Sequence, residues 1–219
     1  MRYIFIILLS IIFFNACSIK TKPNNTYYKM SNAFKTYQKD FLSSYDILAK
    51  NDLKRAKNFA KQNADIDALA TIYLGECALN ISVGKDMKCQ RYLDIKDLLT
   101  NDLLDAYYHL ITLKLKKNDL KIVPKDYVKF AKYLYNKDYT KAYSEILEMP
   151  KVSSQLIASS LIKTSLTKHQ IKSLLKIASF NGYKKSSIFW LKELKNKTKD
   201  IDEQKRIERK ILILQQIKK

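Results

Sequence analysis

Residues that interrupt regular structure are scarce in this chain, which has three Gly and three Pro among 219 residues. Glycine adopts left-handed backbone conformations without a steric cost, so tight β-turns and glycine-rich phosphate loops depend on it. An all-β fold would need many such turns. No segment alternates apolar and polar residues in the manner of a half-buried strand. The sequence therefore predicts an all-α protein.

Length and composition favour one folded domain, with or without an appendage, because domains average about 150 residues. With 47% hydrophobic residues the chain can bury a core, which excludes wholesale disorder. The formal net charge is +20, from 36 Lys and five Arg against 21 acidic residues. Arg is the preferred residue for bidentate recognition of bases and phosphates. An excess made of Lys therefore indicates diffuse surface charge and no nucleic-acid partner.

The first seventeen residues have the form of a secretory signal peptide. Arg2 supplies a positive start, an apolar run of twelve residues extends from Tyr3 to Phe14, and the small residue Ala16 precedes Cys17. A membrane-spanning helix needs about 18 or more apolar residues, so this run is too short to be one. We expect residues 1–16 to be removed as a signal peptide.

The segment Phe14-Asn15-Ala16-Cys17 resembles the lipobox of bacterial lipoproteins, in which an aliphatic residue stands three positions before a cysteine and a small residue just before it. The resemblance implies that Cys17 is acylated and anchors the chain on the periplasmic side of the envelope. Ser18, rather than Asp, implies the outer membrane more than the inner one. Residues 17–26 would form a polar tether. The alternative is an ordinary signal peptide, or an uncleaved anchor helix, with a chance cysteine.

Residues 27–219 show apolar positions at helical spacing, separated by short polar joints. The pattern predicts about ten short helices, the last of which docks as a capping helix. We expect Thr167 and Gln170 to form a capping box, and all three glycines to lie at or near joints. The first helix is expected to carry one long aromatic-rich stripe, formed by Met30, Phe34, Tyr37, Phe41, Tyr45 and Leu48.

Three joints share a polar turn, an apolar residue and a small residue three positions later, where two helices can approach closely. The joints begin at Asn51, Lys137 and Asn181, and their small residues are Ala56, Ala142 and Ser186. Stacked helix pairs bury a core only against their neighbours, so such recurrence indicates a repeat architecture.

Residues 56–92 also resemble one copy of the Sel-type, tetratricopeptide-like helical repeat. The matching residues are Ala56, Phe59, Ala60, Ala68, Leu74, Gly75, Val83, Gly84, Asp86 and Tyr92. The resemblance implies a right-handed α-solenoid of antiparallel helix pairs that binds other proteins without catalysis. Generic helix packing is the alternative interpretation.

Residues that carry chemistry are few. His109 lies four positions after Asp105, a spacing that would pair them on one helix face, and His169 lies in the expected capping turn. Neither belongs to a metal-ligand spacing, and we expect no metal or cofactor. Glu76, in an apolar run, is the one candidate acid for a cell-wall enzyme. A glutamate at the edge of a packed helix face is the more ordinary interpretation.

Cys77 and Cys89 remain as a pair if Cys17 is acylated. In an oxidising envelope they could close a disulfide across a helical hairpin that turns near Gly84. Two reduced, packed cysteines are the equally open alternative.

Basic residues gather toward the C-terminus. Such a surface could hold anionic lipid or an acidic wall polymer, and a solvated helix face is the simpler interpretation. The residues are Lys184, Lys185, Lys192, Lys195, Lys197, Lys199, Lys205, Arg206, Arg209 and Lys210.

These observations favour a membrane-anchored, non-enzymatic lipoprotein that binds another envelope protein through its helical domain. A peptidoglycan-active enzyme or a wall-binding factor with a helical domain is the second hypothesis. A basic nucleic-acid binder would require the N-terminal segment to be something other than a signal.

Overall fold

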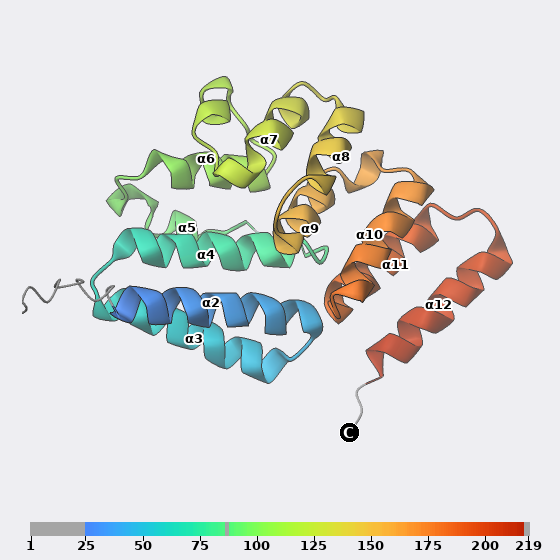
Figure 1. Ribbon diagram of the computed structural model, residues 1–219, viewed down its shortest axis with the longest axis horizontal. Helices are drawn as coiled ribbons and strands as arrows, with labels where there is room; N and C mark the ends of the chain where they lie inside the picture. Colours follow the sequence, from blue (N-terminus) through green and yellow to red (C-terminus); the bar gives the residue numbers. More distant parts are fainter. Residues whose placement is uncertain (1–24, 86–87, 217–219) are drawn as a thin grey trace, which may run out of the picture.

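The computed structural model describes residues 25–85 and 88–216 (Figure 1). Across these residues it contains eleven α-helices, four short 3₁₀-helices and no strand, which confirms the predicted all-α fold of about ten helices. The expected signal peptide, residues 1–16, and the lipidation site Cys17 lie outside the described residues. The first helix begins at Asn25, inside the segment expected to be tether.

The N-terminal half contains α2 (Asn25–Ser43), α3 (Asp46–Gln62), α4 (Ile66–Ile81), α5 (Gln90–Leu93), η2 (Lys96–Leu98), α6 (Asp102–Ile111) and η3 (Lys117–Lys121). The C-terminal half contains η4 (Lys125–Tyr127), α7 (Val128–Tyr135), α8 (Tyr139–Leu147), α9 (Val152–Leu161), η5 (Lys163–Ser165), α10 (Lys168–Phe180), α11 (Lys184–Asn196) and α12 (Ile201–Gln215).

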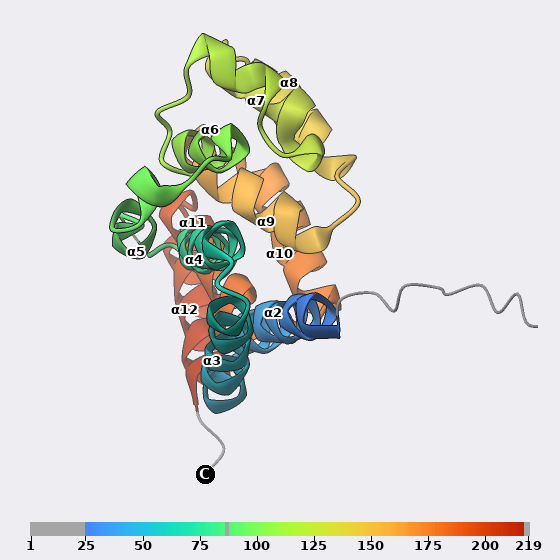
Figure 2. The same ribbon diagram turned by 90° about the vertical axis from the view of Figure 1, so that its left-hand side faces the viewer.

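Neighbouring helices pack as pairs, with α2 on α3, α7 on α8, and α10, α11 and α12 in succession. The molecule also makes contacts between distant parts of the sequence. Helix α4 packs on both α6 and α9, and α11 packs on α2, so the last third of the chain returns to the first helix (Figures 1 and 2). A solenoid in which each repeat contacts only its neighbours would lack these contacts, so the expected solenoid stacking is not established.

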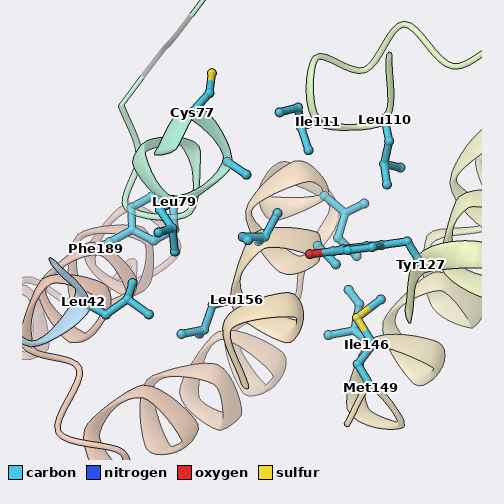
Figure 3. Close-up of a cluster of buried hydrophobic side chains, with 14 of the residues drawn as sticks. Leu42, Cys77, Leu79, Leu110, Ile111, Tyr127, Ile146, Met149, Leu156 and Phe189 are labelled. Atoms are coloured by element: carbon cyan, nitrogen blue, oxygen red, sulfur yellow. The ribbon is translucent and has the colours of Figure 1, made fainter. Parts of the chain in front are cut away.

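The core runs between α4, α6, α9 and α11, and Leu79, Leu110, Leu156 and Phe189 all belong to it (Figure 3). Trp190 of α11 is its largest fully buried side chain. The three small residues expected at close helix approaches, Ala56, Ala142 and Ser186, are all fully buried. Because a small side chain lets two helix backbones come together, these positions fix how the pairs pack.

Six helices end in the same hydrogen-bonded turn. In each, the amide of a left-handed residue bonds three residues back and the next amide bonds five residues back, as in a Schellman motif. Two of the left-handed residues are the glycines that this conformation favours, Gly84 and Gly182. The other four are Ser44, Ala64, Leu113 and Lys137. A chain with three glycines thus ends most of these helices with strained non-glycine residues.

Two expectations about joints are wrong. The chain turns at Ser44 instead of Asn51-Asp52, because Asp52 is buried inside α3, where it pairs with Arg55. The long first stripe is therefore cut, and Tyr45 and Leu48 are 58% and 55% exposed.

The third glycine, Gly75, lies in the middle of α4 and not at a joint. The other two glycines and the Thr167–Gln170 capping box lie where the sequence predicts them.

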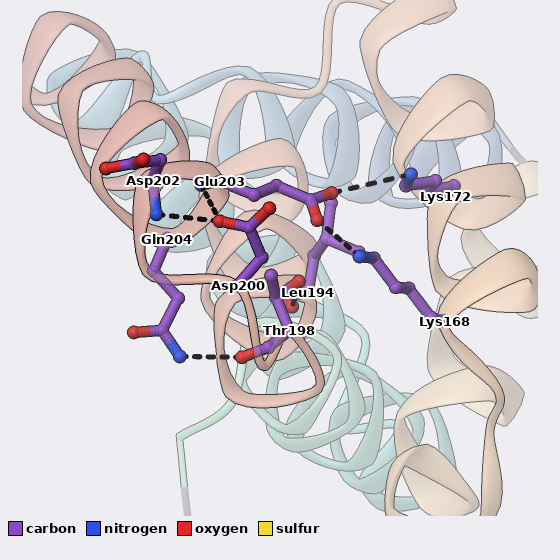
Figure 4. Close-up of polar contacts among 8 residues, drawn as sticks. All are labelled: Lys168, Lys172, Leu194, Thr198, Asp200, Asp202, Glu203 and Gln204. Atoms are coloured by element: carbon purple, nitrogen blue, oxygen red, sulfur yellow. Dashed lines mark hydrogen bonds and ion pairs between the residues drawn. The ribbon is translucent and has the colours of Figure 1, made fainter.

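Helix α12 docks on α11 through Ile207 and Ile211, which are both buried. Its start is held by polar contacts: Asp200 accepts hydrogen bonds from two amides of the first turn, and Glu203 pairs with Lys168 and Lys172 of α10 (Figure 4). The hydrogen bond from Lys168 leads the effects that lower the pKa of Glu203. The last helix therefore packs against the preceding pair.

Candidate functional site

The main candidate site is a cavity of about 740 Å³ on the inner side of α2, which we call the central groove. Five segments separated in sequence supply its walls: α2, α4, the start of α6, the η4 segment and the start of α9. The turn between α10 and α11 adds Asn181 and Tyr183. A volume of this size lies within the range of about 300–1,000 Å³ typical of ligand pockets. Five aromatic side chains line it: Tyr27, Phe34, Tyr107, Tyr127 and Tyr183.

Gly75 allows a close contact between α2 and α4 at the wall of the groove. A Cβ placed on Gly75 would lie 2.3 Å from Cζ of Phe34, so the absence of a side chain is what lets the Phe34 ring lie against α4. The ring also contacts Tyr37 one turn later, with centroids 5.5 Å apart. The sequence offers no local reason for glycine inside a helix, and this contact supplies one.

A chain of hydroxyl groups joins α6, η4 and α9 at the opposite wall. The hydroxyl of Tyr127 interacts with those of Tyr107 and Ser154. The two tyrosine rings are tilted, with centroids 5.5 Å apart. Figure 3 shows the Tyr127 side chain reaching toward α9, the helix that carries Leu156. Burial raises the pKa of both tyrosines, so they stay neutral hydrogen-bonding groups at ordinary pH.

The rim of the groove is polar. Lys151 at the start of α9 pairs with Asp126 at 3.0 Å, and Lys35, Asn101 and Asn181 lie around the opening. Aromatic faces inside and amide or ammonium groups at the edge suit a ligand with both apolar surface and backbone-like polar groups. Such an arrangement can bind and orient a peptide segment.

Cys77 and Cys89 form a disulfide, with Cα atoms 5.4 Å apart. It ties α4 to the residue just before α5 and closes the turn that contains Gly84. Of the two arrangements that the sequence leaves open, the structure contains the bridged one.

Glu76 does not line the central groove. Its carboxylate accepts hydrogen bonds from Lys57 at 2.6 Å and from Arg91 at 3.0 Å, which joins α3, α4 and α5. Lys57 also lies over the ring of Tyr73. Both carboxylate oxygens of Glu76 are therefore engaged in contacts between helices.

His109 pairs with Asp119 of η3, at 3.0 Å, and not with Asp105 as the spacing suggests. Asp105 instead accepts a hydrogen bond from Tyr92 and pairs with Lys96. Burial opposes the ionisation of Asp105, but these partners outweigh it and lower its pKa. Because η3 folds back on α6, the true partner of His109 comes from a later turn that helical spacing cannot reveal. His169 is exposed at the start of α10, as expected.

The expected basic patch is partly neutralised within the molecule. Lys185 pairs with Asp46, Lys195 with Glu208, and Lys205 with Asp202. Lys197 donates a hydrogen bond to the carbonyl of Thr164. The other residues, without an ion pair to a described carboxylate, are Lys184, Lys192, Lys199, Arg206, Arg209 and Lys210. Lys185 therefore joins α11 to α3, Lys195 joins α11 to α12, and both contribute to tertiary structure.

Sequence reasoning missed the central groove. Phe34 is expected as a member of an apolar helix stripe, and nothing in the spacing indicates that it faces a cavity shared with Tyr107. The one local signal was Gly75, a helix-breaking residue inside a helical pattern.

Comparison with family models, curated proteins and solved structures finds no match to this chain. No helix within residues 25–85 and 88–216 combines the length and apolar character of a membrane span. The same residues contain no cluster of three or more His, Cys, Asp or Glu side chains placed to hold a metal ion.

Proposed function

We propose that the protein is a lipoprotein of the bacterial cell envelope that acts as a non-enzymatic scaffold and holds a peptide segment of a partner protein in the central groove. The observation that carries the proposal is the groove itself. Its aromatic lining comes from α2, α6, η4 and the α10–α11 turn, so the folded domain preforms the surface. A preformed surface costs little conformational entropy when a partner binds.

Two features support an envelope location. The N-terminal segment has the pattern of a lipoprotein signal that ends at Cys17. The Cys77–Cys89 disulfide suits an oxidising compartment, since cytosolic thiols are kept reduced. An acyl anchor at Cys17, preferentially on the outer membrane, would hold the groove on the periplasmic side. No cofactor is needed for this role.

Site-specific photo-crosslinking tests the scaffold. A photoreactive amino acid would replace Lys35, an exposed residue of α2 that lines the groove, in cells that produce the full chain. The matched control replaces Lys39, which is exposed on the same helix but does not line it. We expect one envelope protein to be captured from position 35 and not from position 39. Equal capture from both positions, or no capture from position 35, would contradict the proposal.

Anchoring is tested separately. Mass spectrometry of the mature N-terminus should find an acylated Cys17, and Cys17→Ala should release the protein from the membrane fraction. An unmodified Cys17 within an uncleaved chain would refute the lipoprotein assignment and leave the groove untouched.

The geometry gives the cell-wall enzyme no support, because the carboxylate of Glu76 is engaged by Lys57 and Arg91. Peptidoglycan release that depends on Glu76, measured with Glu76→Gln, would revive it.

A further inference from the structure

A second cavity lies where three helices end. It has a volume of about 640 Å³ and lies between the carboxyl ends of α4, α6 and α9, with α5 along one side. We call it the lysine-rimmed pocket. Its lining residues are Ile81, Gly84, Lys85, Lys88, Gln90, Leu93, Tyr108, Ile111, Thr112, Leu113, Lys114, Ser160, Leu161 and Lys163. The central groove shares none of them.

Four of the lining side chains are lysines: Lys85, Lys88, Lys114 and Lys163. The described lining contains no Asp or Glu, and none of the four makes an ion pair with a described carboxylate. Many other lysines of the protein are paired in this way. Four lysines that line one pocket carry like charges, so gathering them there is unfavourable unless an anion joins them.

The helix ends do not cancel this charge. The carboxyl end of a helix carries roughly −0.5 of an elementary charge, so three ends contribute about −1.5 against four positive charges. Asp86 lies outside the described residues and could lower the balance by at most one more charge. The net charge around the pocket is therefore positive whether or not Asp86 contributes to it.

Two of the lysines also contact aromatic rings. Lys85 lies 5.9 Å from the ring centroid of Phe41, and Lys163 lies 5.7 Å from that of Phe189. Both distances are at the outer limit of about 6 Å for a cation–π contact. Contacts at this limit are weak, so they leave the ammonium groups able to bind an anion.

The floor of the pocket is apolar, formed by Ile81, Leu93, Ile111 and Leu161. Leu113 adds an unusual feature. It holds the left-handed position at the end of α6, with φ of 58°, and its side chain is 58% exposed. Among the six left-handed turn residues described above, it is the one with a large apolar side chain. Exposure of the apolar side chain and the left-handed backbone are each unfavourable. Residues with strained backbone are concentrated at binding sites and other functional sites.

We infer that the lysine-rimmed pocket binds a single-chain acyl lipid with an anionic head group. The acyl chain would cover the apolar floor and Leu113, and the phosphate or carboxylate head would lie among the four ammonium groups. An inorganic anion would leave the apolar floor exposed to water, and an uncharged lipid would leave the lysines unneutralised. This inference is independent of the partner-binding role of the central groove.

Binding of fluorescent single-chain lipids to the full chain tests it. The probes are a lysophosphatidic acid, a fatty acid and a lysophosphatidylcholine, each with the same labelled chain. We expect at least one of the two anionic probes to bind tenfold or more tightly than the zwitterionic one. Whichever binds better identifies the head group as phosphate or carboxylate. Inorganic phosphate at millimolar concentration should not displace it.

Matched triple variants locate the site. Lys85→Gln, Lys114→Gln and Lys163→Gln together should weaken binding of the anionic lipid at least tenfold. The control removes the same charge through Lys50→Gln, Lys132→Gln and Lys176→Gln, which are exposed positions away from the pocket, and should change binding less than twofold. Equal loss in both triple variants would show general charge attraction and overturn the assignment.

Leu113→Gly separates ligand binding from folding. Glycine relieves the left-handed strain, so the unfolding midpoint should rise, while the loss of the leucine side chain should weaken lipid binding severalfold. Unchanged lipid binding by this variant would overturn the acyl-chain role. An acidic peptide without an acyl chain that binds as tightly as the lipid would also refute the proposal.

Discussion

The ring of Phe34 lies in the space that a side chain on Gly75 would need, with only 2.3 Å between Cζ of Phe34 and a Cβ built on Gly75. We expect Gly75→Ala to destabilise the protein by about 1 kcal/mol. Overpacking costs about 1–3 kcal/mol, and the better helix propensity of alanine offsets about 1 kcal/mol of that cost. Urea unfolding measures the difference.

The control for this prediction is the double variant Gly75→Ala with Phe34→Ala. Once the ring is gone, alanine at position 75 should stabilise the helix by up to about 1 kcal/mol relative to Phe34→Ala alone. A Gly75→Ala cost that persists without the ring would show that Phe34 is not its cause.

Helix ends offer a second prediction. Ala64 is exposed and left-handed at the end of α3, with φ of 51°. Ala64→Gly should stabilise the protein by about 1 kcal/mol, because left-handed backbone costs other residues about 1–2 kcal/mol and glycine little. Thermal unfolding should show a raised midpoint.

Gly182 provides the reverse experiment. A Cβ at this position meets nothing within 4 Å, so Gly182→Ala tests conformation without a clash. Gly182→Ala should lower the free energy of unfolding by about 1 kcal/mol, because alanine is strained in the left-handed conformation. If both substitutions shift stability in the same direction, the turns are not left-handed as described.

The disulfide gives a third prediction. Reduction of Cys77–Cys89, or the double variant Cys77→Ser with Cys89→Ser, should lower the free energy of unfolding by about 3 kcal/mol, because the loop it closes is released in the unfolded chain. Peptide mapping after alkylation identifies the bridged pair. Dithiothreitol should have no further effect on the double variant, and a stability equal to that of the parent would contradict a structural role.

The fourth prediction concerns pH. Burial raises the pKa of Asp40 above its ordinary value of 3.8, and the carboxylate of Asp52 raises it further, with Lys39 as an opposing cation. Above pH 3.8 the folded protein keeps a proton that the unfolded chain has released. Stability contributed by this carboxyl should therefore fall as pH rises from 3.8 through the raised folded-state pKa, and then level off.

Asp40→Asn should remove this loss of stability with rising pH, because an amide does not titrate. The NH₂ group of the asparagine can still donate a hydrogen bond to Asp52. We expect the variant to be more stable than the parent at pH 7, and the two to converge near pH 3. Urea unfolding across pH 3–7 measures the difference. A difference that does not change with pH would rule out the Asp40–Asp52 pair as its source.

Properties that depend on neighbours in the sequence could be predicted. Helical spacing predicted the all-α fold, and the small residues Ala56, Ala142 and Ser186 are buried where close helix approach was expected. The Thr167–Gln170 capping box is present, because its hydrogen bonds join residues three apart.

Properties that depend on tertiary contacts could not be predicted from the sequence. The partner of His109 is Asp119, because η3 folds back over α6. The first turn lies at Ser44, a residue without strong turn preference, while the polar pair Asn51-Asp52 stays helical because Asp52 bonds to Arg55. Both cavities are assembled from helices that lie far apart in the sequence, and periodicity contains no information about which helix faces meet across them.

The contact between α2 and α11 also determines when the protein can finish folding. Lys185 of α11 lies over the ring of Phe41 in α2 and pairs with Asp46, the first residue of α3, 139 residues earlier in the chain. The earliest helices therefore lack part of their packing surface until almost the whole chain is present, and closing so long a loop slows folding. A chain delivered N-terminus first would cross a membrane before this contact exists. We expect it to arrive unfolded and to complete its structure in one late, cooperative step.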